Sequence, residues 1–382
     1  MANSISEVVP QLLAQGLLAL RENAVMAMLV NRDYEEDAKN KGNSVDIPIP
    51  SAVTAVAVSP AITPPANADT NTSSVAIALD QWYEAPFYLT DKEMMEVQGG
   101  LIPMQASEAI KALANTVDAY IFSQMYPGVY GYTGTAGTTP FASDTTDATQ
   151  ARKILNNQLA PLDDRRFVFD ADAEAEALNL RAFQDMSYSG SAMGLLEGKI
   201  ERKLGMTWFM DQNVPTHTAG TITTGLIVKA STVHAIGTKA IVCTTAASTG
   251  ACALLTGDIV TFAGDTQTYT LTANATEATA STDVTLNVEP GLAVATAGSE
   301  AVAVKATHVC NMAFHRDAFA FANRPLAEQP FPGQIAQSAT DSVSGLSLRL
   351  EVTRQHKQTR WAFDMLYGGI LVRPALATRI AG

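Results

Sequence analysis

The stretch LSLRLEVTRQHKQTRWAFDMLYGGILVRP, residues 346–374, carries the clearest structural pattern in the chain. Leucine or valine alternates with polar residues from Leu346 to Val352, which is the period of a half-buried β-strand. After the polar interval 355–359, the alternation resumes at Trp361. The pattern predicts a long antiparallel hairpin with one face on a core and one wet face.

A long amphipathic helix is predicted upstream of this hairpin. Between Pro103 and Met125 the apolar residues recur at helical spacing, and Pro127-Gly128 ends the pattern. Just before it, Thr90 and Glu93 have the spacing of a capping box and open a short helix. A further helical pattern begins near Val8 and weakens by Leu29. An ordinary amphipathic helix packed on a core is one interpretation of this N-terminal pattern.

A second hairpin is predicted between residues 45 and 79, and no Lys or Arg occurs between Lys41 and Lys92. A long hairpin with few charges and a proline-rich tip is an aggregation hazard in a monomer, so we expect an arm that lies over a second copy of the chain. Pro48 belongs on an edge, or in a strand that leaves the parent sheet. The alternative is a plain edge hairpin. The predicted subunit-contact residues are Val45, Ile47, Ile49, Pro60, Ile62, Pro64, Pro65, Val75, Ile77 and Leu79.

Two further regions differ in composition. Helices at 146–159, 173–183 and 191–204 with a strand at 166–169 predict an α+β unit.

From Thr216 to about Lys305 the chain is rich in Thr, Ala and Val and almost free of charge. Short alternating strands are expected there at 259–262, 268–271 and 284–288. We interpret 216–309 as an inserted β-rich domain, a small sandwich or barrel, with the parent unit resuming at Cys310.

The composition excludes several classes of protein. A length of 382 residues with 47% hydrophobic and 16% charged residues is typical of a globular chain with two or three cores. The formal charge of −13 argues against a protein whose main function is tight phosphate binding, because such binding needs clustered Lys and Arg. No apolar run of membrane-spanning length and no signal peptide is expected. The three cysteines lack C-x-x-C spacing, so free thiols in a reducing compartment are predicted.

No catalytic, cofactor-binding or metal-binding residue is predicted. The glycine-rich segment 130–137 lacks the spacing of a phosphate loop and is interpreted as a surface loop. The acids at 170–176 alternate as if to hold Ca²⁺, but the glycine of an EF-hand is missing, and acids are favoured at a helix start. Val302–Lys305 and His315–Asp317 imitate kinase signatures but lie too close together. The five histidines show no metal-ligand spacing.

Several segments carry a resemblance to a known family. They are Asn311–Ala320, Asn323–Leu326 and Trp361–Gly368 with Arg373-Pro374, together with Gly205–Met210 and Asn213–Pro215. In this order they resemble the major capsid (coat) proteins of tailed bacteriophages, and most closely those of short-tailed phages that carry an inserted domain. Met206 departs from the aromatic residue that the family pattern favours.

The resemblance implies an α+β fold of the Hong Kong ninety-seven capsid type. Its parts would be an N-terminal arm, an extended loop hairpin, a spine helix on the long β-hairpin, an α/β axial domain and an inserted all-β domain. The divisions are 1–40 for the arm, 41–90 for the extended loop, 91–137 for the peripheral domain with the spine helix, 138–215 for the axial domain, 216–309 for the insertion, 310–345 for the axial return and 346–382 for the C-terminal hairpin.

The resemblance also implies a structural function. The expected partner is the chain itself, in the hexamers and pentamers of an icosahedral shell, with a scaffolding protein and a portal during assembly. Packaged double-stranded DNA would lie inside without sequence-specific contact, and no membrane, cofactor or metal is expected. The implied location is the virion, assembled in the host cytoplasm. The alternatives are an adhesin-like binding protein that uses 216–309, and an encapsulin-like cargo shell.

Overall fold

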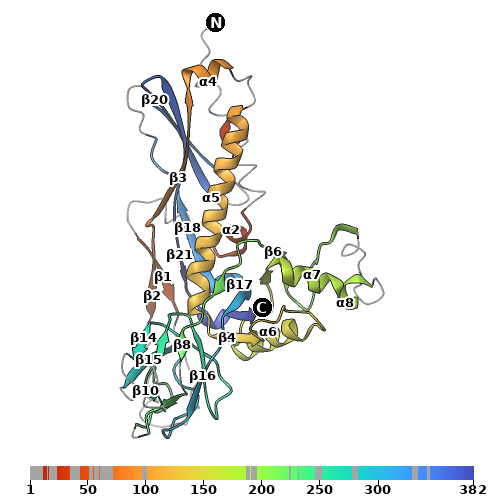
Figure 1. The fold of residues 1–382 in the computed structure, drawn as a ribbon, viewed down its shortest axis with the longest axis vertical. Coiled ribbons are helices and arrows are strands. Elements are labelled where there is room, and N and C mark those ends of the chain that lie inside the picture. Colours follow the sequence, from red (N-terminus) through yellow and green to blue (C-terminus); the bar gives the residue numbers. More distant parts are fainter. Residues whose placement is uncertain are drawn as a thin grey trace.

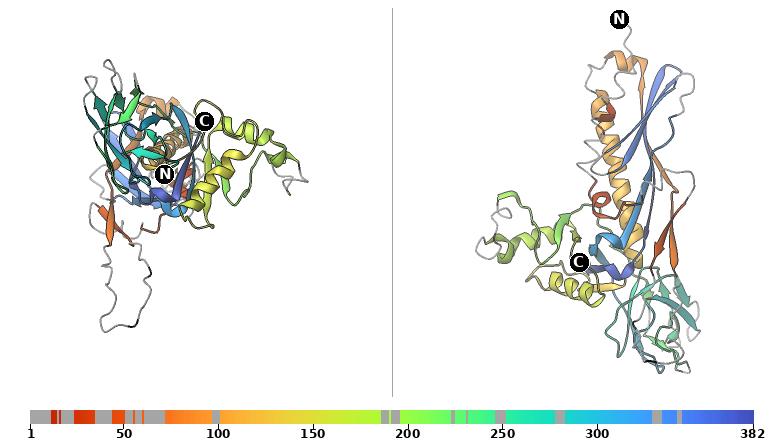
Figure 2. Two further views of the ribbon diagram at one scale, coloured as in Figure 1. Left: turned by 90° about the horizontal axis from the view of Figure 1, so that it is seen from below. Right: turned by 180° about the vertical axis from the view of Figure 1, so that it is seen from behind.

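A computed structural model of the chain describes residues 12–14, 16, 24–34, 44–50, 55, 60, 72–96, 101–185, 190, 196–222, 225–230, 232–245, 252–277, 283–328, 334–341 and 345–382. The described part is elongated (Figure 1). A long helix lies along a long sheet, a helical unit projects to one side, and a small β assembly occupies one end. The view from behind shows the same three parts (Figure 2).

The long sheet is built on the predicted hairpin. Strand β20 (Ser347–Gln355) pairs antiparallel with β21 (Gln358–Leu371) and places Val352 opposite Trp361. The remaining strands are β19 (Gln334–Thr340), β18 (Phe319–Arg324) and β3 (Gln81–Thr90). The turn is tighter than the polar interval suggests, because Gln355 already pairs with Gln358 and only two residues connect the strands. Lys357 adopts a left-handed φ of 57° there.

The two faces of the hairpin differ as predicted. Trp361, Phe363 and Met365 are buried in the main core. The opposite face is polar, where Arg349 donates to both oxygens of Asp364 and Arg360 to those of Glu84. These long side chains cover the face, so the wet face is only half exposed.

Helix α5 (Leu101–Met125) covers the apolar face of this sheet and confirms the predicted spine helix. Ile110, Val117 and Ile121 are fully buried in the shared core. Helix α4 (Asp91–Glu96) precedes it, and its capping box is made as expected. The Thr90 N–H donates to Glu93 at 2.9 Å, while the Glu93 N–H donates to the Thr90 hydroxyl at 3.3 Å.

A second, mixed sheet forms the base of the helical unit. Its strands, in spatial order, are β4 (Gly131–Gly134), β22 (Ala377–Ala381), β17 (His308–His315), β5 (Arg165–Phe169) and β6 (Thr207–Met210). The helices are α6 (Thr146–Asn157), α7 (Ala171–Asn179) and α8 (Arg181–Gln184). Single 3₁₀ turns lie at Tyr126–Gly128, Arg316–Ala318 and Pro374–Leu376.

Two expectations for this region need correction, and a third is confirmed. The glycine-rich segment is not simply a surface loop, because Gly131–Gly134 forms β4 and pairs in parallel with β22. The predicted helix 191–204 is wrong over 198–204, where the chain is irregular. Gly198 and Leu204 have positive φ values of 66° and 53° there, which no α-helix tolerates. Asp170 caps α7 by accepting the Ala173 N–H, which is the ordinary reason for acids at that helix start.

Segment 216–309 contains a closed barrel with its own core. The barrel strands are β9 (Leu226–Val228), β10 (Ala240–Thr245), β12 (Ile259–Phe262), β13 (Tyr269–Leu271), β15 (Val284–Glu289) and β16 (Ala301–Val304). A small sheet of β8 (Thr221–Ile222), β11 (Cys252–Leu254) and β14 (Ala275–Glu277) lies beside it. Strand β7 (Thr216–His217) pairs with the start of β17, so the entry and exit of the segment lie side by side.

The N-terminal region is described only in part. Helix α2 (Met26–Leu29) covers the end of the predicted helical pattern, and residues 12–14 are also helical, whereas 1–11 and 17–23 lie outside the described residues. The carboxylate of Asp118 on α5 accepts the N–H groups of Val25 at 2.9 Å and Met26 at 3.2 Å. The spine helix therefore caps α2, which has no side-chain cap of its own.

Candidate assembly surface

The predicted arm is a two-stranded ribbon separate from both large sheets. Strands β1 (Ser44–Ile49) and β2 (Ser73–Ala78) pair antiparallel, with Val45 opposite Ile77. The separation agrees with the expectation from Pro48 that this strand leaves the parent sheet. At its base the ribbon lies very close to β21, since a Cβ on Gly368 would lie 1.9 Å from the Ala78 carbonyl oxygen. Only glycine permits this approach.

The ribbon places the predicted contact residues in three groups. Val45, Ile47, Ile77 and Leu79 are buried in the chain itself, in a small core with Ala320 and Ala322 of β18. Ile49 and Val75 are half-buried and Pro60 is exposed, whereas Ile62, Pro64 and Pro65 lie outside the described residues. The four buried side chains therefore anchor the ribbon to its own chain. Period-two alternation cannot distinguish an internal partner from a second copy.

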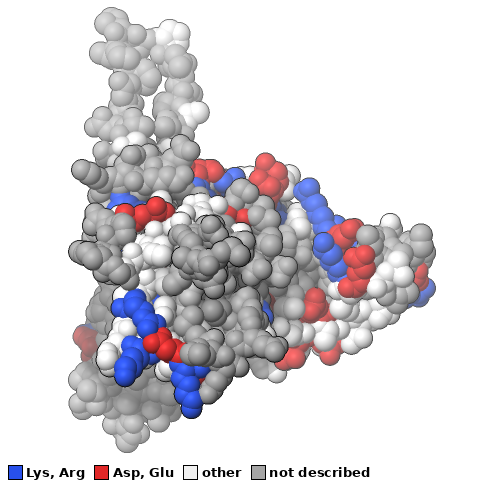
Figure 3. All heavy atoms as spheres, turned by 90° about the horizontal axis from the view of Figure 1, so that it is seen from above, with Lys and Arg blue, Asp and Glu red and all other residues white. Residues whose placement is uncertain are grey.

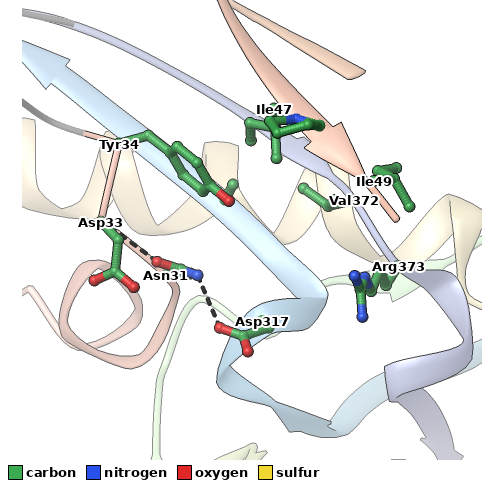
Figure 4. Close-up of a pocket in the computed structure, with 10 residues that line it drawn as sticks. Asn31, Asp33, Tyr34, Ile47, Ile49, Asp317, Val372 and Arg373 are labelled. Carbon is green, nitrogen blue, oxygen red and sulfur yellow. Dashed lines mark hydrogen bonds between the residues drawn. The ribbon is translucent and has the colours of Figure 1, made fainter. Parts of the chain in front are cut away.

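A cavity of about 280 Å³ lies at the base of this ribbon (Figure 4). Ile47 and Ile49 of β1 line one side, and Tyr34 and Asp317 line the other. Below it, the Asn31 amide donates to Asp317 at 2.8 Å and accepts the Asp33 N–H at 2.9 Å. Backbone hydrogen bonds from Asn31 to Phe319 and from Phe321 to Asn31 join this segment to β18. These polar groups thus form hydrogen bonds with one another. The cavity lies where the N-terminal segment, the ribbon and the long sheet meet.

Strand β3 was not predicted, and it presents exposed aromatic side chains. Trp82 is 64% exposed and Tyr88 is 50% exposed. The Trp82 indole donates to Asp364 at 3.0 Å, and Tyr83 stacks on Tyr367 with ring centroids 6.1 Å apart. Among the described residues β3 pairs only with β21, so its outer edge has no strand partner. The aromatic-rich run 81–90 is a sequence pattern that could have indicated this strand, but Pro86 weakens that pattern.

Arg379 of β22 joins the barrel to the rest of the chain from a fully buried position. Its guanidinium donates to the carbonyls of Val129 at 3.0 Å, Pro127 at 3.2 Å and Gly257 at 2.8 Å, and to the Thr270 hydroxyl at 3.3 Å. Gly257 and Thr270 belong to the barrel segment, whereas Val129 and Pro127 follow the spine helix. One side chain therefore fixes three parts of the chain together.

Two histidines complete this joint. His217 Nε2 lies 2.8 Å from the buried Asp258 carboxylate, which also accepts the N–H groups of Gly220 and Leu255. The His308 ring lies 5.5 Å from that of His217, and burial lowers the pKa of His308 to about 4. His308 is therefore neutral at pH 7 in this buried site.

No group of three or more His, Cys, Asp or Glu side chains among the described residues could hold a metal ion. The three cysteines are free, as predicted, and all three are buried. In the space-filling view, the Lys and Arg residues that the structure describes lie next to Asp and Glu on the face shown (Figure 3). None of the described helices combines the length and apolar character needed to cross a membrane.

Comparisons with known proteins give no sequence match but a clear structural one. No family model and no curated protein matches the chain. A structure from Mycobacterium phage Che8 is similar over 94% of this chain and 90% of that chain, with 19% identity and a TM-score of 0.51. The capsid structure of the cyanophage P-SCSP1u is similar over 89% of this chain and 84% of that chain, with 12% identity and a TM-score of 0.50. The chain therefore has the α+β capsid fold of tailed bacteriophages, as the sequence resemblance implied.

Proposed function

We propose that the chain is a major capsid protein that self-assembles into the closed shell of a bacteriophage head. The observation that carries this proposal is the likeness to a phage capsid structure over 89% of the chain. The sequence segments that resemble coat proteins support it independently. Shell formation needs extended, shape-defining surfaces, and this elongated subunit supplies them.

The subunit consists of a rigid body and a projecting ribbon. The spine helix, the long sheet and the mixed sheet share one buried core, which makes them a stiff body. The ribbon β1–β2 is anchored to that body by Val45, Ile47, Ile77 and Leu79. We place the contact with a neighbouring copy in the connection between Ile49 and Ser73, at Pro60, Ile62, Pro64 and Pro65, on the basis of their chargeless, proline-rich sequence.

The remaining partners follow from the same role. A scaffolding protein and a portal would act during assembly in the host cytoplasm, and the mature location is the virion. Double-stranded DNA would fill the shell without tight contact, because a chain with a formal charge of −13 repels phosphates on average. The chain acts as a structural protein and not as an enzyme, and segment 216–309 serves as an autonomous folding unit that supports the subunit or its contacts.

The shell is held by non-covalent contacts. No lysine lies between Lys41 and Lys92, so the ribbon and its tip offer no amine for an isopeptide bond. Stability then comes from interface area accumulated over many copies. Boiling assembled material in detergent should release a single band of subunit mass, and a ladder of larger covalent species would contradict this part of the proposal.

Sedimentation of the purified chain over a range of concentrations tests the proposal. Above a threshold concentration, with or without a crowding agent, very large species should appear abruptly beside free subunit, as expected for a closed shell. A deletion of Ser59–Asn67 should leave a folded, soluble subunit that does not form them, because the anchored part of the ribbon is retained. A chain that stays monomeric under all conditions would contradict the proposed function.

A further inference from the structure

The barrel lies at one end of the subunit and has a hydrophobic core separate from the main core (Figure 1). Between the two cores, Tyr132, Ile259 and Ala381 form a small cluster of buried apolar side chains. Arg379 adds hydrogen bonds across the same contact. We call this contact between β4, β12, β17 and β22 the barrel joint. Because few apolar side chains are buried in the cluster, the strength of the joint depends on its polar groups.

His308 lies in the barrel joint with one ring nitrogen unpaired. It begins β17, pairs with His217 of β7 where the chain enters and leaves the barrel segment, and is 2% exposed. Its Nδ1 lies 2.7 Å from the Ala306 carbonyl oxygen, which can only accept, so Nδ1 carries the proton of the neutral ring. The other nitrogen, Nε2, is buried and has no hydrogen-bond partner. A proton on Nε2 would therefore create a buried N–H and a positive charge with no acceptor.

The groups around His308 oppose a second positive charge. The titratable and charged side chains of the joint are Arg379 on β22, His217 on β7, Tyr132 on β4, Tyr126 after the spine helix, Cys310 on β17, Lys305 before β17 and Asp258 of the barrel segment. Arg379 is already a fully buried cation. The Asp258 carboxylate already accepts hydrogen bonds from Gly220 and Leu255 and lies 2.8 Å from His217 Nε2.

These surroundings determine how the joint responds to pH. Burial is the main cause that lowers the pKa of His308 from 6.5 to about 4, and Arg379 and His217 act in the same direction. If the joint opened, the ring would reach water and its pKa would return toward 6.5. Between these values the open form binds more protons than the closed form. The closed joint is thus most stable above pH 6.5 and weakens as the pH falls toward 4.

We propose that protonation of His308 opens the barrel joint, so that mild acid frees the barrel from the mixed sheet while both parts stay folded. The separate cores allow this, because neither core needs the joint to bury its own side chains. The pairing of His308 with His217 places the protonation at the two connections about which the barrel would move. The proposal concerns the single subunit and does not rest on the proposed shell function.

The three cysteines can distinguish opening of the joint from unfolding. Cys310 is fully buried, and the Arg379 guanidinium donates to its sulfur within the joint. Cys243 and Cys252 are buried in the core of the barrel. Opening of the joint should therefore expose Cys310 alone, whereas unfolding of the barrel would also expose the other two thiols.

Thiol labelling of the full chain, below the assembly threshold, measures this opening. A pyridyl disulfide reagent is suitable because it reacts with thiols in mild acid, and mass spectrometry of peptides assigns each label. Each rate is divided by the rate of the same thiol in the urea-unfolded chain at the same pH. The normalised rate at Cys310 should rise about twentyfold from pH 7 to pH 5, as the two pKa values require for a rapid opening equilibrium. The rates at Cys243 and Cys252 should change less than about twofold.

Two substitutions test the assignment to His308. His308→Gln keeps a neutral amide that can donate to Ala306, and His308→Phe keeps a ring, but neither side chain takes up a proton. In both variants the rise at Cys310 from pH 7 to pH 5 should fall below about threefold, whatever the rate at pH 7. His356→Gln is the control, because it removes an exposed histidine from the turn of the long hairpin and should keep the twentyfold rise.

The unaltered chain decides the question even if a variant fails to fold. A Cys310 thiol that stays protected at pH 5, or labelling of all three thiols together, would overturn the inference. A rise at Cys310 that persists in both H308Q and H308F would also overturn it, because another group would then carry the acid response. These measurements use the unassembled subunit, so their failure leaves the proposed shell function standing.

Discussion

The guanidinium of Arg379 donates a hydrogen bond of 2.8 Å to the backbone carbonyl of Gly257, from a position with no exposed surface. Arg379 belongs to the C-terminal strand and Gly257 to the segment that forms the barrel. The barrel is thus fixed to the mixed sheet by a buried polar contact, in addition to the two chain connections. The position of the barrel relative to the rest of the subunit is therefore defined.

Replacing Arg379 should weaken the whole subunit. Arg379→Met keeps much of the side-chain volume but leaves the carbonyls of Val129 and Gly257 buried without their donor, which should cost about 3 kcal/mol. Urea unfolding followed by tryptophan fluorescence measures this loss. Lys111→Met, which removes an exposed ion pair with Glu108, is the matched control and should cost less than about 1 kcal/mol. Equal effects of the two substitutions would contradict a structural role for Arg379.

Asp118 should make stability depend on pH. Burial, with a contribution from nearby Asp211, raises the pKa of Asp118 from 3.8 to about 8. Between these values Asp118 holds more protons in the folded state than in the unfolded state, so its contribution to stability is greatest below pH 3.8 and falls as the pH rises toward 8. Asp118→Asn keeps an oxygen that accepts from Val25 or Met26 but cannot ionise, so it should flatten this fall.

Urea midpoints at pH 5 and pH 8 check this prediction. The unaltered chain should lose at least about 1 kcal/mol more than D118N between these two pH values. Some slope should remain in D118N, because burial also raises the pKa of Asp211. An unchanged slope in D118N would show that Asp118 does not carry the pH dependence.

Two neighbouring positions on β2 should respond differently to truncation. Ile77 is fully buried against β18, whereas Val75 is half-buried on the same strand. Ile77→Ala should cost about 3 kcal/mol because it leaves a cavity under the ribbon. Val75→Ala should cost less than about 1 kcal/mol. Thermal or urea unfolding of the two variants measures the difference, and similar losses would contradict the internal anchoring of the ribbon.

Segment 216–309 should fold when expressed alone. Its barrel strands close on themselves around buried residues such as Tyr269 and Leu286, with no open sheet edge to pair elsewhere. The isolated segment should give a dispersed NMR spectrum and a cooperative melt. Its melting temperature should lie below that of the same unit in the full chain, where Arg379 adds its hydrogen bonds. A segment that stays disordered alone would contradict an autonomous unit.

The sequence predicts the regular elements of this fold well and its close contacts poorly. The spine helix and the β20–β21 hairpin are long and strongly periodic, so pattern alone identifies them. Strand β4 is not predicted from the sequence because its glycines suggest a loop. A Cβ on Gly131 would lie 2.8 Å from the Thr378 hydroxyl oxygen, so glycine is needed for close pairing with β22. That reason depends on a neighbour about 250 residues away, which no local pattern reveals.

The candidate contact residues show the same limit. Val45 and Ile77 alternate in the manner expected of an intermolecular arm, yet they pack on Ala320 of their own chain. Burial against a distant strand and burial against a second copy need the same side chains. The unusual backbone conformation and the exposure of Leu159 also escape prediction, because a single leucine after a helix forms no pattern.

Cryo-electron microscopy of the purified full chain under assembly conditions tests the central claim most directly. The account predicts closed icosahedral particles in which every subunit shows the spine helix, the long hairpin and the barrel, with the β1–β2 ribbon held on its own subunit and its tip over a neighbour. Open aggregates, or discrete small oligomers that never close into a shell, would contradict it.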